Sequence, residues 1–175
     1  MVWLWLLFLI LAISFGLVAF RGAPYVPSQK FYINQAFREL YPLSAKDVLI
    51  DIGSGDGVVL REASKLGARA IGYEINPFLV IISRLISRKD NRVSVRLADF
   101  WLTKLPDDTT VIYVFSVKRD MKKLIKWTQK ETDRLNRNIY LISLGFELGD
   151  TKPIKELGAY HLYEFHSLQS SEAQV

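Results

Sequence analysis

Short apolar runs and longer segments with apolar residues at helical spacing take turns along most of the chain. Val48 to Ile52 is a continuous apolar run that carries one acid, Asp51, as expected of a parallel strand buried on both faces. Further strands are predicted at residues 69–73, 92–97, 110–116 and 138–144, and a closing hairpin at 153–157 and 160–165. Strands that alternate with helices predict an α/β fold with a Rossmann-like, doubly wound sheet.

Helices are predicted where apolar residues recur at three- and four-residue spacing. This pattern covers residues 28–41 and 58–66, and it recurs after the fourth strand with Met121 and Leu124 on the inner face. Another helix is predicted over 76–88, with Asn76 and Pro77 as its cap and first turn. That helix is broadly apolar, so we expect its apolar residues to be buried: Leu79, Val80, Ile82, Leu85 and Ile86.

The turn after the first strand carries the strongest functional signal. It reads D-x-G-x-G-x-G from Asp51 to Gly57, and its glycines, Gly53, Gly55 and Gly57, let the backbone turn tightly and approach a ligand. Glu74 stands at the tip of the second strand, 23 residues after Asp51, where a carboxylate can accept hydrogen bonds from both hydroxyls of a ribose. The sequence therefore predicts a nucleotide site, with a merely flexible turn as the alternative.

The spacing of the glycines indicates which nucleotide binds. A dinucleotide fold requires G-x-G-x-x-G, whereas here the third glycine comes one residue early and position 58 is Val. This favours S-adenosylmethionine (SAM) over NAD. SAM has no pyrophosphate for the helix N-terminus to bind, and its cationic sulfonium and amino group suit Asp51 and Asp56. The acidic loop, in which Ser54 follows the first glycine, is poorly suited to phosphate.

Two segments further along the chain are candidates for cofactor contacts. Asn76 follows Glu74 closely, although an Asn at this position more often serves only as a helix cap. Asp99, Phe100 and Trp101 follow the third strand, where an acid and aromatic rings could bind and sandwich an adenine. An acid in a loop beside two core aromatics is the alternative for this second segment.

The N-terminal segment predicts a membrane anchor. Val2 to Phe20 contains no charge, and its 19 residues would form about 28 Å of helix, close to the roughly 30 Å hydrocarbon core of a bilayer. A cleaved signal peptide is the competing interpretation, but a basic n-region is missing and Arg21 interrupts the expected cleavage region. Every Lys and Arg follows the apolar run, so we expect a single-pass protein with its catalytic domain in the cytoplasm.

Charge and composition argue against several other kinds of binding site. The 23 Lys and Arg against 18 Asp and Glu give a net charge of +5, too mild to establish binding to nucleic acid or lipid. The chain has no cysteine and two histidines, which excludes disulfides and thiolate sites and makes a metal centre improbable. Lys118, Lys122 and Lys126 form one basic flank of the helix after the fourth strand, which is either a solvated surface or a contact for anionic lipid headgroups.

Several segments together resemble the class I, seven-strand methyltransferases. Within that class the chain is similar to the membrane-associated lysine methyltransferases whose mitochondrial members modify the ATP synthase c-subunit and the adenine nucleotide translocase. The likeness rests on the apolar N-terminal segment and on four motifs: PYVP at Pro24–Pro27, DIGSGDG at Asp51–Gly57, GYEINPFLV at Gly72–Val80 and ADFW at Ala98–Trp101.

The resemblance implies a SAM-dependent methyltransferase, most readily a protein-lysine N-methyltransferase. It implies that Gly53, Gly55, Glu74 and Asp99 bind SAM and that the PYVP segment, with Tyr25 as a candidate for the substrate pocket, lies over the active site. The expected organisation is an anchor over 1–21, a linker over 22–27, a methyltransferase domain over 28–168 and a disordered tail over 169–175.

The acceptor is expected to be a protein with a lysine near the membrane. Methylation of a nucleobase amine usually accompanies an Asn-Pro-Pro-Tyr type loop after the fourth strand, where this chain has Phe115, Ser116, Val117 and Lys118. Nucleic acid is therefore a disfavoured substrate, and no metal is expected. A lipid or small-molecule methyltransferase and a SAM-binding assembly factor without turnover remain the alternatives.

Overall fold

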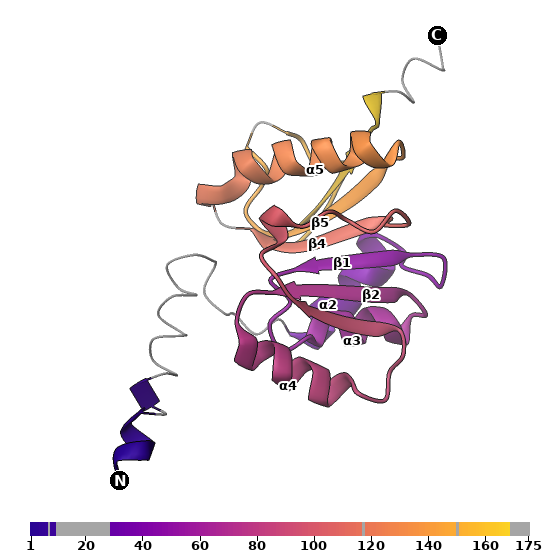
Figure 1. Ribbon diagram of the computed structural model, residues 1–175. Coiled ribbons are helices and arrows are strands. Elements are labelled where there is room, and N and C mark those ends of the chain that lie inside the picture. Colours follow the sequence, from indigo (N-terminus) through magenta and orange to yellow (C-terminus); the bar gives the residue numbers. More distant parts are fainter. Residues whose placement is uncertain (7, 10–28, 117, 150, 169–175) are drawn as a thin grey trace.

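The centre of the molecule is a seven-stranded sheet with the order β3-β2-β1-β4-β5-β7-β6 (Figure 1). The computed structural model describes residues 1–6, 8–9, 29–116, 118–149 and 151–168. The strands are β1 (Val48–Ile52), β2 (Arg69–Glu74), β3 (Val93–Leu97), β4 (Val111–Ser116), β5 (Ile139–Gly145), β6 (Lys155–Leu157) and β7 (Tyr160–Phe165). The first five strands are parallel, and β7 runs antiparallel between β5 and β6. The predicted doubly wound sheet and closing hairpin are confirmed.

Helices lie at each of the four positions predicted after residue 27. They are α2 (Lys30–Gln35), which continues into the π-helical turn η1 (Ala36–Leu40), then α3 (Val58–Lys65), α4 (Pro77–Ser87) and α5 (Met121–Leu135). The helix predicted over 28–41 is therefore divided in two, and its first predicted residue, Ser28, lies outside the described residues. Short 3-10 turns, η2 (Phe100–Leu102) and η3 (Lys118–Asp120), follow β3 and β4.

Two apolar clusters pack on the two faces of the sheet. One contains Phe37 with residues of α3 and α4 such as Leu60 and Val80, and the other contains Met121 and Leu124 of α5. This division follows from the strand order, because the chain moves in one direction from β1 to β3 and in the other from β4 to β5. Helices α3 and α4 consequently cover one face and α5 covers the other.

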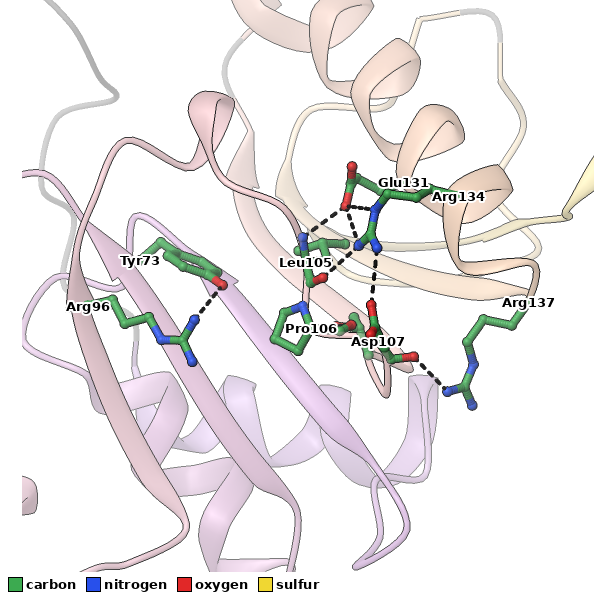
Figure 2. Close-up of polar contacts among 9 residues, drawn as sticks. Tyr73, Arg96, Leu105, Pro106, Asp107, Glu131, Arg134 and Arg137 are labelled. Carbon is green, nitrogen blue, oxygen red and sulfur yellow. Dashed lines mark hydrogen bonds and ion pairs between the residues drawn. The ribbon is translucent and has the colours of Figure 1, made fainter.

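On the second face, the loop from Ala98 to Thr110 packs beside α5. Arg134 of α5 donates to the carbonyl oxygen of Leu105 at 2.6 Å and pairs with Asp107 at 3.1 Å (Figure 2). The buried carboxylate of Glu131 accepts from the Leu105 amide at 2.8 Å and from Arg134 (Figure 2). This network fixes the loop to α5 and holds Leu105 in the core.

Helix α4 corrects one prediction. Ile82, Leu85 and Ile86 were expected to be buried, but they are 45%, 62% and 54% exposed. The helix lies at the margin of the sheet over β2 and β3, so only one side of it meets the protein (Figure 1). Its apolar pattern correctly predicted a helix, but the expectation that all its large side chains are buried was wrong.

The predicted membrane span falls mostly on residues that the structure does not describe. Residues 2–6 are helical, whereas residues 7 and 10–20 lie outside the described part, as does the linker that contains Tyr25. Within the described ranges, we find no helix with the length and apolar character needed to cross a bilayer.

Candidate active site

The sheet reverses its winding between β1 and β4. The chain leaves β1 toward β2 and leaves β4 toward β5, so the two connections depart in opposite directions from neighbouring strands. In open α/β sheets, ligands bind outside the carboxyl ends of the strands at such a switch point. Ile52, the last residue of β1, lies beside Tyr73 of β2 and Val114 of β4. The glycine turn begins immediately after it.

The glycine turn is held firmly, yet one side of it is open. Gly53, Gly55 and Gly57 have φ values of 76°, 53° and 80°, a region that residues with a Cβ rarely adopt. The amides of Gly53 and Ser54 donate to the carbonyl oxygen of Tyr73 at 2.9 and 3.2 Å. A Cβ added to Gly53 would meet nothing within 4 Å, which leaves room for a ligand there.

At Gly57, unlike at Gly53, the space for a side chain is already filled by a neighbouring residue. A Cβ at this position would lie 2.1 Å from the Oγ of Ser83, so no side chain fits between the turn and α4. Gly72 of β2 likewise gives space to Ser54, whose Oγ would be 2.4 Å from an added Cβ. The sequence indicated the glycine turn but gave no role to Gly72 or Ser83, because their importance comes from packing between separate elements.

Glu74 lies at the end of β2 beside the glycine turn, as predicted. One carboxylate oxygen accepts from the Gly55 amide at 2.8 Å, and the other accepts from the Asn76 amide at 2.7 Å. A carboxylate oxygen can accept more than one hydrogen bond, so both can still accept from a ribose hydroxyl. The side chain is almost fully buried, which fixes its position before any ligand arrives. Its contact with ribose remains a prediction.

Asp51 is buried without compensation among the described residues. The side chain is 3% exposed, and its Oδ2 has no hydrogen-bond partner in that part of the chain. Burial, followed by the negative charges of Glu74 and Asp56, raises the pKa of the Asp51 carboxyl well above its ordinary value. A buried acceptor of this kind suits a cationic ligand group, because a nearby positive charge would stabilise the ionised form.

Asp56 is directed toward α3. Its carboxylate pairs with Arg61 at 3.3 Å and accepts from the amide of Val58 at 3.2 Å. Arg61 also donates to the Asp56 carbonyl oxygen at 2.6 Å. The predicted contact between Asp56 and a cationic cofactor would therefore compete with an existing ion pair.

Asn76 and Ser54 are both buried at this edge. The side-chain oxygen of Asn76 accepts from the Phe78 amide at 2.9 Å, which is the capping role considered as the alternative. Its Nδ2 and the Oγ of Ser54 have no hydrogen-bond partner among the described residues. Buried polar atoms of this kind usually have partners, so these two remain candidates for ligand contacts.

The aromatic residues after β3 form a stack that extends to α5. Asp99 accepts from the amide of Trp101 at 3.0 Å, and the ring centroids of Phe100 and Trp101 are 4.1 Å apart. Trp127 packs edge-on against both rings, and the Nζ of Lys123 lies 4.0 Å from the Trp101 centroid. The rings therefore contact each other as in the alternative considered above, and binding of an adenine here stays a prediction.

Sequence reasoning missed Trp127, and it placed Lys123 on the basic flank without its contact to Trp101. Trp127 follows Leu124 by three residues, so extending the periodicity of α5 would have placed it near the inner face. Within the described ranges, no group of three or more His, Asp or Glu side chains is arranged to hold a metal ion.

The comparisons with known proteins agree with this geometry. Residues 51–155, more than half of the chain, match the family model described as ANTKMT methyltransferase domain. The ATP synthase c-subunit lysine N-methyltransferase of Xenopus laevis is 32% identical over 111 residues, 62% of this chain and 48% of that protein. The ribosomal RNA small subunit methyltransferase A of Thermotoga petrophila is 34% identical over 92 residues, 50% of this chain and 35% of that protein.

A solved structure extends the likeness over most of the fold. The RNA methyltransferase of Salinibacter ruber, in complex with S-adenosyl-L-homocysteine, has a TM-score of 0.69 and 26% identity, and the match covers 80% of this chain and 92% of that one. The chain spans about half the length, or less, of the curated relatives it matches. The sheet, its glycine turn and the match over 51–155 lead to one conclusion: this chain belongs to the ANTKMT methyltransferase domain family.

Proposed function

We propose that the protein is a SAM-dependent methyltransferase that methylates a lysine side chain of a protein at or near a membrane. The observation that carries this proposal is the buried Asp51 carboxylate, whose Oδ2 has no partner among the described residues, next to an open Gly53 at the switch point of the sheet. Family membership supports the reaction class. The names of the Xenopus laevis relative and of the mouse adenine nucleotide translocase lysine N-methyltransferase support lysine as the acceptor.

The residues present fit SAM in charge and in hydrogen-bonding capacity. Glu74 is held by two backbone amides and retains acceptor capacity for the ribose hydroxyls. Asp51 offers a negative charge to the amino group and sulfonium of the cofactor. When bound, SAM supplies a methyl carbon that is electrophilic because it is attached to a positively charged sulfur.

The acceptor lysine must be neutral before its nitrogen can attack. Its ordinary pKa is about 10.4, so the site has to desolvate the amine or accept its proton. Phe115 lies near the carboxyl end of β4 and Phe146 follows β5, so both residues come at the edge of the sheet where the acceptor is expected. These residues would favour the uncharged amine, and orientation of the two reactants would supply most of the remaining rate enhancement.

The proposed location follows from the N-terminal sequence. A retained helix over Val2–Phe20 would anchor the chain, and the seven residues from Arg21 to Pro27 reach at most about 25 Å when extended. The domain would then work close to the headgroups on the cytoplasmic side, where a juxtamembrane lysine is accessible.

One experiment separates this proposal from the alternatives. Membranes, ribosomal RNA and lipid extracts from a strain that lacks the protein are incubated separately with the purified full chain and radiolabelled SAM. We expect label in a membrane protein, on lysine after hydrolysis. Label in RNA would instead favour the activity named for the Thermotoga petrophila relative, and label in lipid would indicate a lipid methyltransferase. SAM binding without any transfer would support an assembly factor.

A further inference from the structure

Helix α4 has its large apolar side chains on the outside. Ile81, Ile82, Leu85 and Ile86 are 61%, 45%, 62% and 54% exposed. The side that faces the sheet instead contains Leu79, Val80 and two serines, Ser83 and Ser87, all of them buried. A surface helix of a globular protein normally directs its large apolar side chains inward, whereas most of those of α4 face outward.

The exposed side chains form one continuous stripe. Together with the half-buried Phe78, they occupy positions i, i+3, i+4, i+7 and i+8 of the helix, a spacing that places them along one face. We call this set the outer stripe: Phe78, Ile81, Ile82, Leu85 and Ile86. Figure 1 shows α4 at the margin of the sheet, and the exposed fractions show that no described residue covers the stripe.

Cations border the outer stripe, and exposed acids are missing from the same stretch. Arg84, Arg88, Lys89 and Arg92 are all exposed. Between Pro77 and Leu97, all of which the structure describes, the only acid is Asp90, which is partly buried and accepts from the amide of Arg92 at 3.1 Å. An apolar helix face with a cationic border matches the acyl chains and anionic headgroups of a lipid surface.

We infer that α4 is a lipid-contacting element, which rests its outer stripe in the headgroup region of an anionic bilayer. This inference goes beyond the proposed function and does not depend on methyl transfer. A second copy of the chain fits the surface less well, because the same face of that copy would present further cations and no exposed acid to neutralise them. A lipid surface supplies both the apolar environment and the negative charge.

The contact would bring the edge of the sheet that carries the glycine turn and Glu74 close to the membrane. Helix α4 begins just after Asn76, two residues beyond Glu74, and its Ser83 lies against Gly57 of the glycine turn. If α4 rests on a bilayer, only this helix separates the bilayer from the glycine turn. The basic flank of α5 is on the opposite face of the sheet, so α4 and that flank cannot both rest flat on one membrane.

The test uses the absence of cysteine from the chain. In the full chain, Leu85→Cys and, separately, Lys126→Cys on α5 each accept a single environment-sensitive fluorophore, and unfolding curves verify that both variants fold. Each is mixed with phosphatidylcholine vesicles, with or without phosphatidylglycerol, that contain a lipid-attached quencher. We expect the label at position 85 to be quenched, more strongly with phosphatidylglycerol, while the label at 126 is unaffected. Adding Arg88→Gln or Lys89→Gln should raise the lipid concentration for half-maximal quenching roughly fivefold for each charge.

Three outcomes would overturn the inference. Quenching at 126 without quenching at 85 would place the basic flank of α5 on the membrane instead. Equal quenching at both positions would indicate non-specific adsorption. A label at 85 that is already shielded without vesicles, and insensitive to the lipid quencher, would show that another part of the chain or a second copy covers the outer stripe.

Discussion

Asp51 and Glu131 are both buried acids, but their surroundings differ. Glu131 is 4% exposed, and its carboxylate accepts from the Leu105 amide and from Arg134, so its charge is compensated (Figure 2). Asp51 is 3% exposed, and the described residues provide no cation beside it and no partner for its Oδ2. An unpaired buried charge is costly, so a protein that retains one is expected to use it with a ligand. The comparison separates Glu131, which helps to hold the fold together, from Asp51, which we propose binds a ligand.

Glu74 shares features with both acids, and its replacement should have the largest effect. Glu74→Ala removes the acceptor of two buried amides and the predicted partner of the ribose hydroxyls. We expect SAM affinity to fall by roughly 1.5 to 3 kcal/mol and stability by roughly 2 kcal/mol. Calorimetric titration and urea unfolding measure the two losses separately.

Glu74→Gln is the matched control for this prediction. It keeps one carbonyl acceptor and removes the charge, so it should lose less stability than the alanine variant while still binding SAM more weakly. If both variants bound SAM as the unchanged protein does, Glu74 would be only a brace for the glycine turn.

Glu131→Ala should unfold the protein more easily without a direct effect on the cofactor. The change leaves the Leu105 amide without its acceptor and takes the carboxylate partner from Arg134, which is part-exposed. We expect a loss of roughly 2 to 3 kcal/mol in the free energy of unfolding, measured in urea. Asp108→Ala, which removes an exposed ion pair with Arg69, should cost less than about 1 kcal/mol. Equal losses in the two variants would contradict the structural role given to Glu131.

The sequence predicted regular elements better than it predicted their partners. The strands and the closing hairpin were predictable because apolar runs, turn residues and period-two spacing are local signals. The burial of Ile82, Leu85 and Ile86 was not, because a helical pattern shows which residues share a face but not what lies opposite it. The same limit applies to Trp127, which meets Phe100 and Trp101 across 26 or 27 positions of the chain.

For the candidate site, too, the sequence predicted the positions of the motif residues but not all of their side-chain partners. The order of glycines and the position of Glu74 follow from the chain itself, and both lie where the motif places them. The pairing of Asp56 with Arg61 was not anticipated, although the two are only five residues apart. Whether a carboxylate faces a ligand or a neighbouring cation depends on side-chain geometry that the motif does not specify.

Asp51→Asn should stabilise the free protein and weaken cofactor binding. Because the folded state raises the pKa of Asp51, the unfolded chain loses this proton first, and native stability falls as pH rises from about 4 through the folded pKa. Asparagine does not titrate, so its stabilising advantage should be absent below about pH 4 and should grow as the pH rises to 8. Unfolding at both pH values measures the difference, and titration calorimetry measures the expected loss of SAM affinity. An Asn variant that is less stable at pH 8 would mean that the carboxylate is compensated after all.

Asp56→Asn should have the smallest effect, and it tests whether the acids of the glycine turn act as one set. Because the Asp56 side chain is 29% exposed and already paired with Arg61, we expect SAM affinity and stability each to change by less than about 1 kcal/mol.

Arg61→Gln is the matched variant on the other side of this ion pair. It frees the Asp56 carboxylate, so it should leave SAM affinity unchanged or slightly increase it, and the increase should disappear in the double variant. Calorimetry on the two single variants and the double variant isolates this coupling. If Asp56→Asn alone weakened binding as much as Asp51→Asn does, both carboxylates would face the cofactor, and the distinction between a paired and an unpaired acid would not hold within this turn.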